Sequence, residues 1–218
     1  NSSIYSDMQN IWDEYKDNSK MNLILSGSIY SLMKKIFEDK KEPLFGRANN
    51  KIHLKPFTVK TLKDILKENY PNYQNSDLLS FYIFTGGVAK YVEIFVEKKA
   101  FTFDKQLDLI FDDFSLFLEE GKNLLIEEFG KEYTTYFSIL SLIASSKTSR
   151  TEIESVLGRN IGGYLEKLEK DYTLIKKIKP IFAKEGSRTV KYEIIDNYFN
   201  FWFRFIYKYK SAIEIENY

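Results

Sequence analysis

The sequence contains no cysteine, one histidine, only four prolines and no long uninterrupted apolar run. Without cysteine there are no disulfides and no thiolate metal sites, and the single histidine, His53, has no ligand-type neighbours, so we expect no metal site. No apolar run approaches the roughly 18 residues of a membrane-spanning helix. These absences exclude disulfide-stapled and membrane-spanning classes, and they are compatible with the reducing cytoplasm, where we expect the protein.

The composition is that of a folded globular protein. Of the 218 residues, 44% are apolar and 29% are charged, which is enough for one large domain or two small ones with real cores. Because 32 basic residues are balanced by 31 acidic ones, the net charge is +1 and no overall field attracts DNA or an anionic membrane. Aromatic residues reach 17%, and they are frequent in the C-terminal half.

The first 57 residues carry a mixed helix and strand pattern. Apolar residues recur at helical spacing in 4–16 and again in 29–37. Between them, Met21–Ser26 is an apolar run that predicts a buried strand, and Lys51–Lys55 alternates as a half-buried strand does. The pattern therefore predicts a small α/β part.

From Thr58 onward the strand pattern gives way to helices. Thr58 is a typical N-cap, and Gly86 and Gly87 follow Thr85 as a helix stop, with a glycine expected in the left-handed conformation. A third glycine, Gly130, interrupts a later apolar pattern. We expect helices at 58–69, 76–84 and 88–98, and two long helices between 101 and 146.

The last third has the order of a winged helix-turn-helix. Ser149 and Glu152 have capping-box spacing at the start of one helix, and Gly162–Asp171 is the candidate recognition helix. Two strand-like runs, 174–181 and 189–195, surround a turn at 184–187. The aromatic segment Asn197–Tyr209 that follows is predicted to be core or interface rather than a cofactor site.

The charges of this unit argue against a sequence-specific DNA reader. The charged residues of the recognition-helix candidate sum to −1, whereas phosphate contacts need clustered cations. The hairpin has more basic residues than this helix. Any DNA contact should therefore be confined to the hairpin, and it should be weak or absent. The candidate residues are Lys176, Lys177, Lys184, Arg188 and Lys191.

Three motifs together resemble one known family. They are Leu23–Ser28, which ends in Ser-Gly-Ser, the loop Pro43–Ala48 with Gly-Arg-Ala, and Thr85–Tyr91 with Gly-Gly-Val-Ala-Lys-Tyr. This ordered series resembles the prokaryotic (archaeal-type) ATPases, a STAND-like branch of the AAA+ P-loop NTPases. The resemblance implies a mostly α fold with a small α/β part. Residues 1–57 would be the C-terminal part of a truncated ATPase core, and residues 58–130 a helical lid. Residues 131–218 would be a winged helix with an aromatic C-terminal helix.

The resemblance assigns roles, and each has a structural alternative. Ser26 matches a sensor and Ser28 a nucleotide contact, or both belong to a strand-to-helix turn with Ser28 as N-cap. Arg47 matches an arginine finger, or it pairs a carboxylate such as that of Glu42. The family element with Gly86, Gly87 and Lys90 lies beside the nucleotide, but here Ala89 replaces its usual proline, and the glycines also serve as a helix stop.

The nucleotide-binding half is absent from these residues. The chain has no Gly-x-x-x-x-Gly-Lys-[Ser/Thr] loop, and no apolar strand ending in Asp-Glu precedes Ile4. We therefore expect an inactive piece of an ATPase that binds ATP and Mg²⁺ through an upstream P-loop half and switches conformation with them. The alternatives are a winged-helix DNA-binding regulator, or a protein-interaction module or oligomer formed through the winged helix or the aromatic helix.

Overall fold

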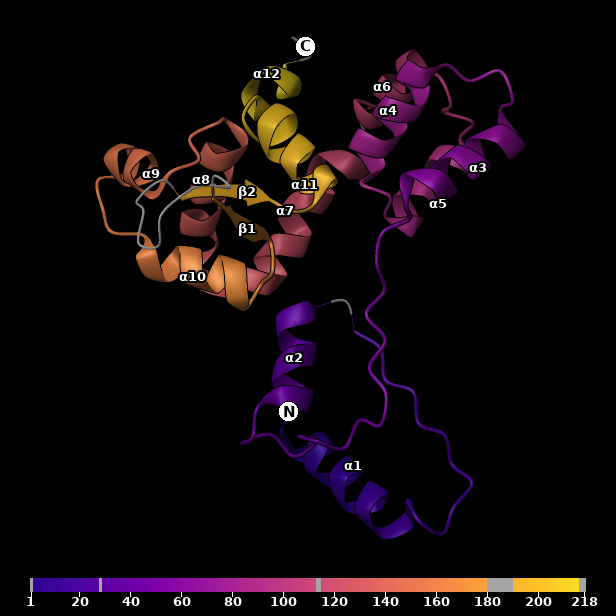
Figure 1. Cartoon of the computed structure of the whole chain (residues 1–218), viewed down its shortest axis with the longest axis vertical. Coiled ribbons are helices and arrows are strands. Elements are labelled where there is room, and N and C mark those ends of the chain that lie inside the picture. The colour runs from indigo at the N-terminus through magenta and orange to yellow at the C-terminus, as the bar shows by residue number, and fades with distance from the viewer. Residues whose placement is uncertain (1, 28, 113–114, 180–189, 216–218) are drawn as a thin grey trace. The chain divides into compact units, whose positions relative to one another are not determined.

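The computed structural model describes residues 2–27, 29–112, 115–179 and 190–215, and the chain divides into two compact units, residues 1–54 and 55–218 (Figure 1). Helices dominate both units, and the sheet found in these ranges is a two-stranded hairpin. This confirms the expected mostly helical class with a small β part. None of the helices in the same ranges is long and apolar enough to cross a bilayer.

The first unit contains the two helices that its periodicity predicts. They are α1 (Ser2–Tyr15) and α2 (Tyr30–Glu38). Among the described residues of this unit, only Ile36 of α2 and Leu44 of the following loop are buried hydrophobic residues. The unit therefore has very little core of its own.

The two strands predicted in this unit do not form. Residues 21–25 and 51–55 have no regular secondary structure and no strand partner, and Ile24, Ile52 and Leu54 are 82%, 86% and 88% exposed. The prediction is wrong here because a strand needs a neighbour for its backbone hydrogen bonds, and no described segment offers one. The apolar pattern that suggested strands instead lies open to solvent.

The second unit begins with helices in the predicted order. Two long helices were expected between residues 101 and 146, but the described residues of this range form three α-helices, because the first ends at Ile110 and the next begins at Leu116. The helices are α3 (Val59–Asn69), α4 (Asn75–Thr85), α5 (Ala89–Glu97), α6 (Phe103–Ile110), α7 (Leu116–Phe129) and α8 (Tyr133–Ala144), with a 3₁₀ turn η1 (Gly130–Glu132) before α8.

Side-chain caps fix several of these helix starts. The Thr58 hydroxyl accepts a hydrogen bond from the Thr61 N–H at 3.2 Å, as expected. For α4 we expect Ser76 to be the N-cap, but the N-cap is Gln74, two residues earlier. The Asp77 carboxylate accepts from the Gln74 N–H at 2.8 Å and also from the Phe103 N–H at 3.1 Å. One buried carboxylate thus ties the start of α4 to the start of α6.

The helix-helix-helix-hairpin order is present in the last third. After α8 come α9 (Arg150–Leu157), α10 (Gly162–Lys170), β1 (Ile175–Ile178) and β2 (Lys191–Ile194). Ser149 and Glu152 form the predicted capping box, with the Ser149 N–H donating to the Glu152 carboxylate at 2.9 Å. The strands are antiparallel, and Ile175 pairs with Ile194 on the buried side. The predicted turn at 184–187 lies outside the described residues.

The aromatic C-terminal segment closes the core of the second unit. It comprises α11 (Asn197–Phe201), the π-helix η2 (Trp202–Tyr207) and α12 (Lys210–Glu214). Tyr198, Trp202 and Phe203 are almost fully buried in a cluster that runs from Leu62 to Ile206, which confirms the core role. The division that we predict near residue 130 stays a prediction, since one core spans it.

Candidate functional site

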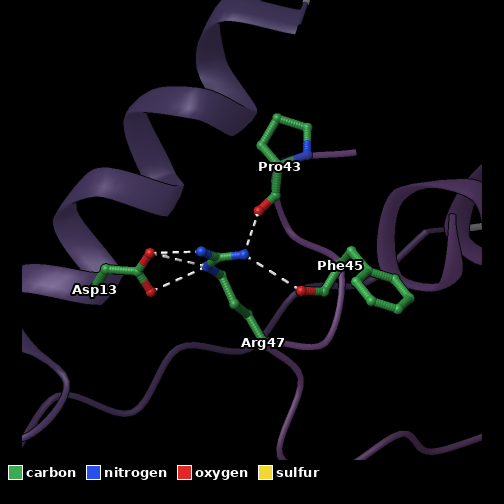
Figure 2. A network of polar contacts seen from close by, with 4 residues as sticks. All are labelled: Asp13, Pro43, Phe45 and Arg47. Atoms are coloured by element: carbon green, nitrogen blue, oxygen red, sulfur yellow. Dashed lines mark hydrogen bonds and ion pairs between the residues drawn. The ribbon is translucent and has the colours of Figure 1, made fainter. Parts of the chain in front are cut away.

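Arg47 lies at the centre of a polar network in the first unit (Figure 2). Its Nε and Nη2 donate to the two carboxylate oxygens of Asp13 at 3.0 and 2.6 Å, and its Nη1 donates to the Pro43 carbonyl at 2.7 Å. A longer contact of 3.3 Å reaches the Phe45 carbonyl. The hydrogen bond from Arg47 lowers the pKa of Asp13 and raises that of the guanidinium. The network fastens the 43–47 loop to α1.

The partner of Arg47 is not the one the sequence suggested. Glu42, the nearby carboxylate, contacts Lys35 at 3.5 Å, whereas Asp13 lies 34 positions before Arg47. Gly46 allows the loop to turn, because its φ is +70°. No sequence pattern links residues so far apart, so Asp13 could not be found by motif.

A polar hollow of about 270 Å³ adjoins this network. It is open to solvent and small for a nucleotide, yet two cationic side chains, Lys16 and Arg47, line it. Because the Arg47 donors are already engaged, an anion here would compete with Asp13 for the guanidinium. The remaining lining residues are Trp12, Asp17, Gly46 and Asn49.

The predicted phosphate-facing serines are not gathered beside Arg47. Ser26 is exposed at the end of the unpaired 21–26 segment, and no hydrogen bond joins it to Arg47 in the described part of the chain. Ser28 lies outside the described residues. Of this group of predicted site residues, the structure thus places only Arg47 in a defined polar contact.

The Gly-Gly element forms a tightly packed joint in the second unit. Gly86 and Gly87 have φ values of +59° and +75°, so the helix stop predicted there is confirmed. A Cβ on Gly87 would lie 2.4 Å from the Phe57 carbonyl oxygen, and the Phe57 N–H donates to the Gly87 carbonyl at 2.7 Å. A Cβ on Gly86 would lie 3.0 Å from the Tyr198 nitrogen. Three distant segments therefore meet at this turn.

A partly buried carboxyl completes the joint. Asp196 accepts from the Phe199 N–H at 3.0 Å and so caps α11, and burial raises the pKa of this carboxyl above its ordinary value. The neighbouring Tyr198 ring is tilted at 42° to that of Tyr91 of α5, with their centroids 4.5 Å apart, and the Tyr198 hydroxyl donates to the Phe117 carbonyl at 3.3 Å. Burial likewise raises the pKa of both tyrosines. The start of α11 is thus locked onto the α4–α5 turn.

Lys90, the predicted nucleotide contact in this element, is engaged elsewhere. Its ammonium lies 2.8 Å from the Glu120 carboxylate and links α5 to α7. Ala89, which stands where the family has proline, is exposed at the first position of α5. At this position a proline would also be tolerated, because the first N–H of a helix has no partner within the helix.

The predicted basic residues of the hairpin are partly neutralised. Lys176 pairs across the strands with Glu193 at 3.2 Å, and Lys177 pairs with Glu169 of α10. Lys191 is exposed. Lys184 and Arg188 lie outside the described residues. Of the three predicted contact residues that are described, two therefore have a carboxylate competitor for any phosphate.

Comparison with known proteins identifies one relative by sequence. The chain is 31% identical over 217 residues to the uncharacterized protein MJECL04 of Methanocaldococcus jannaschii. The match covers 98% of this chain and 47% of that protein, so the chain spans about half the length of its relative. No family model matches the chain, and no solved structure matches it.

Proposed function

We propose that this chain is one part of an ATP-binding switch protein of the archaeal-type ATPase kind. Residues 1–57 contribute to its nucleotide-binding core, residues 58–130 form a helical lid, and residues 131–218 form a winged helix with an aromatic C-terminal helix. The chain alone does not hydrolyse ATP. The proposal places the whole protein in the cytoplasm.

The exposed apolar segments of the first unit carry this proposal. Fully burying side chains such as Ile24, Ile52 and Leu54 is worth about 1.5–3 kcal/mol each, and here all three face solvent. A unit with two buried hydrophobic residues cannot repay the cost of ordering its chain from its own core. The 21–25 segment is short and mostly apolar, as buried strands of a parallel sheet are, and the 51–55 segment alternates as a half-buried strand does. Such a unit is expected to complete its sheet with strands from elsewhere.

The length of the relative agrees with this proposal. MJECL04 is about twice as long as this chain, and the match covers almost all of this chain but only about half of MJECL04. A protein of this kind therefore has room for a further half of similar size. In the proposal, that half supplies the phosphate loop and the neighbouring strands.

The residues of this chain do not by themselves fit ATP. The sequence has no phosphate loop, the Arg47 guanidinium is held by Asp13 and two backbone carbonyls, and Lys90 is paired with Glu120. What the chain can contribute is a held cation beside a polar hollow and a rigid joint at Gly86 and Gly87. ATP with Mg²⁺ would be bound chiefly by the other half.

Isothermal titration calorimetry tests the proposal. Mg·ATP titrated into the 218-residue chain should give no heat of specific binding, because the N–H groups and the lysine of a phosphate loop are missing. The longer parent protein should bind under the same conditions. Micromolar binding by the chain alone, or a parent without a phosphate loop, contradicts the proposal.

DNA binding is the second candidate, and the helix-helix-helix-hairpin order favours it. The ion pairs of Lys176 and Lys177 reduce the positive charge that the described hairpin can offer to DNA, although Lys179 and Lys191 are exposed. We therefore propose at most weak contacts with phosphates. A protein partner, or a second copy of the chain bound through the aromatic helix, fits the winged-helix part better than DNA does.

A further inference from the structure

A band of four phenylalanines runs through the second unit from α6 to η2. Phe103 and Phe205, at its two ends, are 44% and 47% exposed, although both are large apolar residues. Between them lie the buried rings of Phe84 and Phe201. Successive ring centroids along the band are 6.2, 4.8 and 5.6 Å apart. The band is thus a continuous row of rings that reaches the surface at its two ends, Phe103 and Phe205.

Opposite charges lie at the two ends of this band. Asp104 and Asp108 are exposed one helical turn apart, next to Phe103 on α6. Arg204 and Lys208 are exposed one turn apart, next to Phe205. Within the described ranges, none of these four side chains forms an ion pair. Lys105, also exposed, lies between the two aspartates, so these charges sum to −1 at the α6 end and to +2 at the η2 end.

The basic end holds its cations against aromatic rings. The Arg204 guanidinium lies 5.6 Å from the centroid of the Phe205 ring, and the Lys208 ammonium lies 5.0 Å from that of Tyr209. Arginine and aromatic residues are enriched in the centres of protein interfaces.

The backbone beneath this end is unusual. Trp202–Tyr207 forms a π-helix, which is rare and is found frequently at functional positions. It buries Trp202, Phe203 and Ile206 while leaving Arg204 and Phe205 outside.

We propose that this band is the interface of a two-fold symmetric dimer of the chain. A two-fold axis brings the same patch of both copies together, so that each acidic end meets the basic end of the other copy. Phe103 and Phe205 then lose their exposure together. An acidic partner would face Asp104 and Asp108, and a basic one would face Arg204 and Lys208, so a second copy is the occupant that satisfies both ends. This inference does not depend on the nucleotide role.

Charge exchange tests the proposal. Sedimentation velocity over a concentration series should show the wild-type chain moving from 25.8 kDa toward twice that mass. Each double reversal, Arg204→Glu with Lys208→Glu or Asp104→Lys with Asp108→Lys, should stay monomeric. An equimolar mixture of the two variants should form a heterodimer, because each then offers the ends that the other lacks.

A control separates this interface from other routes to association. Lys63→Glu with Lys67→Glu reverses two exposed lysines one turn apart on α3 and changes the net charge by the same amount, so it should dimerise as the wild type does. Circular dichroism checks that each variant is folded. A wild type that is monomeric throughout, a dimer that survives both reversals, or a folded mixture that remains monomeric overturns the proposal.

Discussion

Gly87→Ala should be one of the most damaging methyl additions in this chain. The residue has a φ of +75°, and its new Cβ would lie 2.4 Å from the Phe57 carbonyl oxygen. That oxygen belongs to the backbone, so no side chain can rotate away to make room. The close contact of these two backbone segments also includes the hydrogen bond from the Phe57 N–H to the Gly87 carbonyl.

The magnitude follows from two separate costs. A residue with a Cβ in the left-handed conformation costs about 1–2 kcal/mol relative to glycine. Forcing a methyl group into occupied space costs a further 1–3 kcal/mol or so, since the neighbouring backbone must move. We therefore expect Gly87→Ala to lower the free energy of unfolding by about 2–5 kcal/mol.

Two other glycines separate these costs. Gly158 has a φ of +66° and open space around its Cβ position, so Gly158→Ala should show the conformational cost alone, about 1–2 kcal/mol. Gly163 has neither constraint and lies in α10, so Gly163→Ala should stabilise by about 0.5–1 kcal/mol. Urea unfolding followed by far-UV circular dichroism measures all three variants.

The reasoning fails if Gly87→Ala is no less stable than Gly158→Ala. Local displacement of residues 55–57 could relieve the clash without global unfolding, so hydrogen exchange at the Phe57 amide provides a second measurement. It should exchange faster in Gly87→Ala than in the wild type. Unchanged protection together with unchanged stability would show that Phe57 does not pack on this turn.

The remaining predictions concern charged groups. Asp196→Asn keeps an N-cap for α11 but removes a carboxyl whose pKa burial raises above its ordinary value of 3.8. Such a carboxyl favours folding only while it is protonated, so the free energy of unfolding of the wild type should fall as the pH rises through that raised pKa. In urea melts, the Asn variant should show a smaller fall of this free energy over the same pH range. Arg47→Ala and Asp13→Asn break the same ion pair and should loosen the first unit alike in hydrogen exchange. If Arg47 also acts on the nucleotide, Arg47→Ala alone should lower ATP turnover of the parent, far more than its ATP affinity. In gel shifts, duplex binding should be weak, steeply salt-dependent and indifferent to sequence, and tight binding to one duplex at physiological salt would contradict this.

Most helices could be predicted from the sequence because their signals are local. Thr58 and the Ser149–Glu152 capping box lie within a few residues of the N–H groups that they satisfy. The start of α4 was misplaced because Gln74 is not a typical N-cap, and its role depends on Asp77. Most of the helices of the second unit could therefore be predicted from helical spacing and capping residues.

The strands and the polar contacts could not be predicted in the same way. An apolar run such as 21–25 indicates that a strand is possible, but its partner strand decides whether it forms. The pairing of Asp13 with Arg47 joins residues 34 positions apart, and the approach of Asp196 to Gly86 joins two helix ends over a still longer separation. Such contacts depend on tertiary packing, which no short motif encodes.

Hydrogen exchange of the backbone amides in 21–25 and 51–54 tests the central claim most directly. In the 218-residue chain these amides have no strand partners and should exchange rapidly. In the longer parent protein, the account predicts strong protection, because the segments pair as strands with the half that carries the phosphate loop. Equally rapid exchange in the parent would contradict the account.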